Sequence, residues 1–197
     1  MTRAAANLRK KRKVAWGITG SGDKLEETIE TMKRIRAQYE DGVEVQVFVS
    51  KAGEQVLKHY GLLDDLRSSF GRVFVEVDAN TPFLAGWLQT RRFEFLLVAP
   101  ATSNTVAKIA AGIADTMLTN GTILALKAFV PVYVLPSDYE EGIVYTKLPG
   151  GRDMKLKIRK EDAENVRKLK KMENVSVLEK PSEINGVFAR VFGKENS

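Results

Sequence analysis

Two segments of this chain bring glycine and small polar residues together at the point where an apolar stretch ends. The first is Thr19-Gly20-Ser21-Gly22, which follows the apolar "VAWGI". The second is Pro100 to Asn104, "PATSN", which follows the apolar "FEFLLVA". Glycine-rich turns and helix N-termini bind anions through their backbone N–H groups, and phosphate is a common ligand. The two segments together predict a site for a ligand that carries phosphate.

The first segment differs from the known dinucleotide loops. Leu25 stands where the third glycine of G-x-G-x-x-G belongs, and the chain has no G-K-[ST]. The second predicted strand ends in Ser50 and Lys51 rather than in an acid that would hold ribose hydroxyls. NAD is therefore disfavoured, while Ser50 and Lys51 leave NADP open. The loop suits a single phosphate or an anionic ring edge, and a glycine turn without ligand is the alternative.

The second segment places three hydrogen-bonding residues in a row, Thr102, Ser103 and Asn104. Such residues can cap the first N–H groups of the following helix or donate to a ligand. Capping needs only one of them, so the run of three favours a ligand site.

Apolar and polar residues alternate along the chain in a pattern that predicts regular βα units. Asp23 and Glu26 resemble a capping box at the start of the first helix. The order predicts an α/β fold, a doubly wound, mostly parallel sheet in a Rossmann- or flavodoxin-like three-layer sandwich, with ligands at the carboxyl ends of the strands. We expect strands at 13–19, 43–50, 72–77, 93–101, 130–137, 153–160 (exposed) and 175–179, and helices at 23–39, 52–61, 82–90, 161–172 and 181–192, with two more within 104–129.

Composition excludes several kinds of site. The 197 residues include no cysteine, so thiol catalysis and iron–sulfur ligation are excluded, and we expect no metal site. The single histidine, His59, lies in a predicted helix and is expected at a surface or interface. No apolar run is long enough for a membrane helix and no signal peptide is recognisable, so we expect a cytoplasmic protein.

The net charge of +6 is concentrated in two clusters. Residues 1–13 carry six basic and no acidic side chains, and residues 152–171 carry nine basic and four acidic ones. We expect a basic, disordered arm at 1–12 and a single domain at 13–197, with a ligand-binding core at 13–140 and a C-terminal extension at 141–197. Solvated charge is one reading of the clusters; nucleic-acid binding is unlikely because neither contains an aromatic residue to stack on bases.

The segment "PATSNTVAKIAAGIADTMLT" resembles the P-A-S-A-N-T…A-K-x-A-x-G-x-A-D motif of the homo-oligomeric flavin-containing cysteine decarboxylase superfamily, and "GITGSG" is similar to that family's first loop. The later segments "IRKEDAENVRKLKKM" and "VSVLEKPSEI" resemble the archaeoflavoprotein and dihydromethanopterin reductase branch. The resemblance implies FMN as cofactor, and a redox flavoprotein that takes electrons from ferredoxin and passes them to an acceptor such as the pterin dihydromethanopterin. The cofactor-binding residues that it implies are Thr19, Gly20, Ser21, Gly22, Ser50, Lys51, Pro100, Ala101, Thr102, Ser103, Asn104 and Asp115.

The resemblance also implies a homo-oligomer, a trimer or a dodecamer. The apolar segments 82–90 and 116–129 support this, because they exceed what one small sheet can cover. Both basic clusters would suit the docking of acidic ferredoxin.

Two family elements are missing. Residues 78–95 contain no histidine where the decarboxylases have a catalytic one, and "LPSDYEEGIVYTKLPGG" contains no P-x-M-N-x-x-M-W substrate clamp. These absences argue against a decarboxylase, so a decarboxylase or a prenyltransferase of the same fold is kept only as the alternative function. A basic nucleic-acid-binding module is the second alternative. The loop at Tyr139, Glu140 and Glu141 is where a substrate lid would lie.

Overall fold

A six-stranded parallel sheet forms the centre of the computed structural model, which describes residues 10–148 and 151–193. The strand order β3-β2-β1-β4-β5-β8 reverses between β1 and β4, and this is the switch point at which doubly wound proteins bind ligands. The predicted fold class is therefore confirmed. The strands are β1 (Arg12–Ile18), β2 (Val43–Val49), β3 (Val73–Val75), β4 (Leu96–Ala101), β5 (Val132–Pro136) and β8 (Val175–Val177).

Helices cover both faces of the sheet because its strands are apolar on both sides. Val14, Trp16 and Ile18 of β1 face one core, and Ala15 faces the other. The first core is covered by α1 (Leu25–Gln38), α2 (Lys51–His59), α3 (Leu63–Phe70) and α8 (Ile184–Phe192). The second is covered by α4 (Leu84–Gln89), α5 (Ser103–Ala110), α6 (Met117–Lys127) and α7 (Lys160–Leu169). A short 3-10 helix, η1 (Pro181–Glu183), precedes α8.

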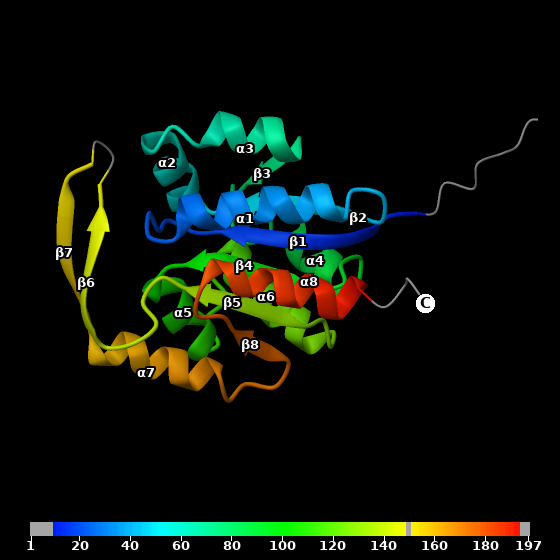
Figure 1. Cartoon of the computed structure of the whole chain (residues 1–197). Coiled ribbons are helices and arrows are strands. Elements are labelled where there is room, and N and C mark those ends of the chain that lie inside the picture. The colour runs from blue at the N-terminus through cyan, green and yellow to red at the C-terminus, as the bar shows by residue number, and fades with distance from the viewer. Residues whose placement is uncertain (1–9, 149–150, 194–197) are drawn as a thin grey trace, which may run out of the picture.

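An antiparallel hairpin, β6 (Gly142–Lys147) and β7 (Asp153–Ile158), stands beside the sheet at the carboxyl-end side (Figure 1). The exposed strand predicted at 153–160 corresponds to β7. The sequence did not indicate β6, because its consecutive apolar residues Ile143, Val144 and Tyr145 lack the alternation of a half-buried strand. All three are exposed.

Two further predictions differ from the structure. The helix α3 was not expected, since the sequence pattern predicts only a connection between the helix at 52–61 and the strand at 72–77. The capping box was wrong: α1 begins at Leu25, and its N-cap is Lys24, which has φ 59° and no side-chain cap. The Lys24 amino group instead donates to the carbonyls of Pro136 and Glu179, at 2.8 and 3.0 Å. This tertiary contact holds the loop in a conformation that places Asp23 outside the helix.

After the hairpin, the C-terminal part of the chain returns to the parallel sheet. Strand β8 pairs with β5, and α8 packs on α1 through the rings of Phe188 and Tyr39. Residues 1–9 of the predicted arm lie outside the described residues, and Arg12 is the first residue of β1. Within the described part of the chain, no helix is long and apolar enough to span a bilayer.

Candidate functional site

A cavity of about 660 Å³ opens at the carboxyl ends of the central strands. Both segments singled out in the sequence reach it, one after β1 and one after β4. Seven of the predicted site residues line it: Thr19, Gly20, Ser50, Lys51, Thr102, Asn104 and Asp115. The remaining lining residues are Ala52, Glu76, Asp78, Ala79, Thr105, Thr116 and Leu118.

The other five predicted residues support the wall of the cavity and do not line it. Ser21 is buried and its hydroxyl donates to the carbonyl of Asp23 at 3.3 Å. Gly22 lies against Tyr60, where a Cβ would come within 2.3 Å of the phenol oxygen. Pro100 and Ala101 end β4 with their carbonyls hydrogen-bonded, and the Ser103 hydroxyl donates to the carboxylate of Asp138.

The buried Thr19 side chain joins the two segments. Its hydroxyl donates to the Pro100 carbonyl at 2.8 Å and accepts the N–H of Thr102 at 2.8 Å. With 2% of its surface exposed, Thr19 fixes the spacing between the end of β1 and the end of β4.

Three helices begin at the cavity, and all three begin in the same way. The N-cap residues Ser50, Thr102 and Thr116 line it, and each side chain accepts the N–H of the residue three positions on. The second helical residues, Ala52, Asn104 and Leu118, line it too. An N–H at this position has no intrahelical partner. The positive ends of α2, α5 and α6 therefore converge on one space, which favours a bound anion.

Two glycines let these helices come so close to β1. A Cβ on Gly17 would lie 2.6 Å from the Leu118 side chain of α6, and a Cβ on Gly20 would lie 2.7 Å from the Ala52 Cβ of α2. Both distances are shorter than real Cβ contacts. A side chain at Gly20 would therefore push α2 away, and one at Gly17 would displace the Leu118 side chain that lines the cavity.

The sequence analysis missed Glu76, which follows β3. Its carboxylate lines the cavity and accepts the N–H of Lys51 at 3.0 Å and of Met117 at 2.7 Å. Only 9% of the residue is exposed. A carboxylate at the end of the otherwise apolar "VFVEV" was the available signal, since an unpaired acid is seldom buried.

Next to the cavity, the loop after β1 carries two charges in a partly desolvated setting. Burial raises the pKa of Asp23 above its ordinary value, although the nearby Lys24 charge opposes this shift. Burial lowers the pKa of Lys24, although the neighbouring carboxylates oppose that shift. Lys24 binds the loop to the ends of β5 and β8, as described above.

Several aromatic and charged residues have structural contacts instead of a place in the cavity, or lie at its edge. Trp16 is fully buried and donates to the Ala99 carbonyl at 2.8 Å, and Trp87 packs against the second core. His59 ends α2 on the surface and does not line the cavity. Tyr139 packs under Lys170 rather than forming part of a lid. Asp115 pairs with Lys108 at 2.8 Å beside the cavity.

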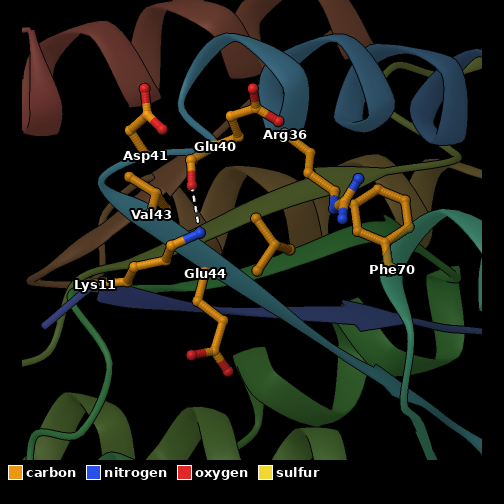
Figure 2. A pocket seen from close by; sticks show the side chains of 8 residues that line it. Lys11, Arg36, Glu40, Asp41, Val43, Glu44 and Phe70 are labelled. Atoms are coloured by element: carbon orange, nitrogen blue, oxygen red, sulfur yellow. Dashed lines mark hydrogen bonds between the residues drawn. The ribbon is translucent and has the colours of Figure 1, made fainter. Parts of the chain in front are cut away.

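A second cavity, of about 340 Å³, lies at the opposite end of the sheet, at the start of β2 (Figure 2). Its lining includes Lys11, Arg36, Glu40 and Glu44, and none of the predicted site residues. Helices end here rather than begin, so it lacks the free N–H groups of helix N-termini that the first cavity has. It is not the site that the sequence predicted.

Comparison with known proteins gives close matches. The Flavoprotein family model matches residues 2–190. An uncharacterized protein of Methanocaldococcus jannaschii is 48% identical over 90% of this chain and 95% of its own. The protein of the same organism named dihydromethanopterin reductase (acceptor) is 34% identical, over 89% of this chain and 95% of its own.

Comparison with solved structures also finds flavoproteins with the same fold. Burkholderia xenovorans DmrB in complex with FMN, described as a cubic protein cage for redox transfer, is 32% identical. It superimposes with a TM-score of 0.79, covering 96% of this chain and 99% of its own. A dodecameric FMN-dependent UbiX-like decarboxylase from Escherichia coli O157:H7, with 18% identity and a TM-score of 0.62 over 85% of this chain and 79% of its own, shares the fold. With its fold, its paired loop segments and a match along nearly its full length, the chain belongs to the Flavoprotein family.

Proposed function

We propose that this protein is an FMN-binding redox flavoprotein. The observation that carries the proposal is the convergence of three helix N-termini on one cavity at the switch point of the sheet. Such a cavity suits a ligand with one phosphate and a large planar ring. The relative solved with FMN supports this choice of cofactor, since the similarity to it extends along almost the whole chain.

The residues present fit this cofactor. Hydroxyls of Ser50 and Thr102 and the free N–H groups of Ala52 and Asn104 offer donors for the phosphate and the ribityl chain. Ala79 and Leu118 add apolar surface for the ring. FMN supplies one- and two-electron transfer when bound, and the protein binds it, orients it and adjusts its surroundings.

We further propose ferredoxin as the electron donor and a pterin such as dihydromethanopterin as the acceptor. The two relatives named dihydromethanopterin reductase support the pterin. The basic cluster on β7 and α7 supports an acidic donor, because the hairpin lies on the cavity side of the sheet (Figure 1). The described residues of the other cluster, Lys10 to Lys13, lie at the far end, so we assign docking to β7 and α7 alone.

The same proposal includes a homo-oligomer, a trimer or a dodecamer. Val77 and Ile113 are 61% and 46% exposed, and each lies two residues or fewer from a residue that lines the cavity. Phe83 and Phe129, in the two apolar segments noted in the sequence, are 60% and 69% exposed. Cage-like and dodecameric relatives support an assembly that covers these side chains. Light scattering over a range of concentrations tests it, and a particle of 21.9 kDa throughout contradicts it.

The decarboxylase alternative has less support. The chain's only histidine lies away from the cavity, and the relatives with decarboxylase names that share this fold are below 25% identity.

Purification under air, followed by an absorbance spectrum, tests the cofactor. We expect the visible bands of oxidised flavin, either at once or after addition of FMN. Under argon, reduced ferredoxin should then bleach these bands faster than NADH or NADPH does. A protein that stays colourless with excess FMN contradicts the cofactor, and faster bleaching by NADPH contradicts the donor.

A further inference from the structure

Glu76 holds together two helices that lie on opposite faces of the sheet. Helix α2 covers the first core and α6 covers the second, yet the first N–H of each donates to the same carboxylate. The two bonds use different oxygens, Oε2 for Lys51 and Oε1 for Met117. The carboxylate thus acts as a clamp across the end of the sheet, at the place where β2 and β1 meet the cavity.

The same carboxylate is a negative charge in the cavity wall. Of the other charged side chains that line the cavity, Lys51, Asp78 and Asp115 are exposed, whereas Glu76 is almost fully buried. Water screens the exposed charges and screens a buried one much less. Glu76 is therefore the charged side chain in the lining that acts most strongly on a ring bound there.

We infer that Glu76 is a positioning residue for the two helices and that its charge lowers the reduction potential of the bound flavin. This inference rests on the proposed binding of FMN. Reduction adds electrons to the ring, and a nearby buried negative charge disfavours the added charge. Glu76 therefore makes the protein hold reduced FMN less tightly, relative to oxidised FMN, than a neutral side chain would.

Glu76→Gln tests the charge. Glutamine keeps the size of the side chain and one acceptor oxygen, so we expect oxidised FMN to stay bound. We expect the affinity for reduced FMN, relative to oxidised FMN, to rise about tenfold, as for one charge at moderate distance in a protein of intermediate effective dielectric. The midpoint potential of the bound flavin, measured against reference dyes, should move to a more positive value. Asp78→Asn is the matched control, because it removes an exposed charge from the same cavity and should move the potential less.

Amide hydrogen exchange without flavin tests the clamp. In Glu76→Ala, and less strongly in Glu76→Gln, the amides of Lys51 and Met117 should exchange faster, while those at the start of α5 should not change. If Glu76→Ala does not fold, Glu76→Gln still provides both measurements.

The results separate the two proposals. Wild-type protein that does not bind FMN contradicts the proposed function, and the inference about the potential fails with it. Wild-type protein that binds FMN, with no change of potential in Glu76→Gln beyond that in Asp78→Asn, overturns the inference alone. Unchanged exchange at Lys51 and Met117 in the variants overturns the clamp.

Discussion

The two ends of the parallel sheet differ in electrostatics, because helix N-termini gather at one end and helix C-termini at the other. At the carboxyl end, α2, α5 and α6 begin, and their second residues, whose N–H groups have no intrahelical partner, line a cavity. At the amino end, helices finish, and basic side chains bind carbonyls in or just after their last turns: Lys11 reaches the carbonyl of Glu40 after α1, Arg12 that of Val191 in α8, and Arg91 that of Ala128 after α6. Cations stabilise helix C-termini in this way. The basic residues near the N-terminus thus have a structural role, and the site residues at the other end leave room for a ligand.

The pKa shifts of charged side chains also differ between the two ends. At the amino end, a hydrogen bond from Arg12 lowers the pKa of Glu94, so that this charge has its partner within the chain. At the carboxyl end, burial raises the pKa of Asp23 and lowers the pKa of Lys24. Charges at the ligand end are held partly against their solvation preference, which is common where a protein binds or reacts.

The sharpest test of this comparison is one methyl group added at each end. Gly20→Ala places a Cβ 2.7 Å from Ala52, so α2 must shift away from the loop after β1. Overpacking of this kind costs about 1–3 kcal/mol, and FMN should bind roughly 10- to 100-fold more weakly. Gly42→Ala, before β2, is the control, because a Cβ there meets nothing within 4 Å. Equal FMN affinity in the two variants, by fluorescence titration, would show that the cavity tolerates the shift.

A second test removes a buried hydroxyl at one end and an exposed cap at the other. Thr19→Val leaves the N–H of Thr102 without its acceptor, and we expect the free energy of unfolding to fall by about 1–3 kcal/mol. Thr19→Ser should restore most of it. Lys11→Met removes an exposed cap bond and should cost only a few tenths of a kcal/mol. Urea titrations compare the three, and a larger loss for Lys11→Met would reverse the comparison.

Charge reversal distinguishes the two ends as docking surfaces. Changing Lys168, Lys170 and Lys171 to Glu should slow flavin reduction by ferredoxin several-fold at low salt, with the difference shrinking as salt rises. The matched control changes Lys10, Arg92 and Lys127, exposed bases of the amino end, to Glu. Stopped-flow absorbance follows the reduction. If the control slows it as much, net charge rather than a docking site determines the rate.

The smallest expected effect concerns pH at the amino end. The pKa of Glu94 is lowered below its ordinary value of 4.5, so its ion pair with Arg12 stabilises the fold above that pH. The stabilisation is lost as pH falls through the lowered pKa. Both side chains are about one-third exposed, so we expect only a few tenths of a kcal/mol. Glu94→Gln should be less stable than wild type at pH 6, and the difference should shrink as the pH falls below 4.5, as measured by urea titration.

Local patterns were enough to predict most of the fold. The alternating apolar segments indicated the doubly wound sheet, and the strands and helices that they marked are present, whereas β6 and α3 are present but were not predicted. The capping box failed because Lys24 makes contacts with Pro136 and Glu179, more than a hundred residues away. Such a contact leaves no trace in the spacing of nearby residues.

The site was predicted in its segments but not in its arrangement. Thr19 to Gly22 and Pro100 to Asn104 stand out because glycine, hydroxyl and amide residues follow buried strands. The sequence could not show that Ser103 turns to Asp138 while Asn104 lines the cavity, since both follow the same strand and carry similar groups.

The sequence by itself determined the strands of the parallel sheet, the order in which strands and helices alternate, and that two strand ends carry small polar residues. Only the tertiary structure decided that α6 begins beside α2, that Glu76 joins them, and that the two basic clusters lie at opposite ends of the sheet. The physical reason is range. Periodicity and turn chemistry act over a few residues, whereas the order β3-β2-β1-β4 and the glycine contacts that admit Leu118 and Ala52 depend on how separate segments pack.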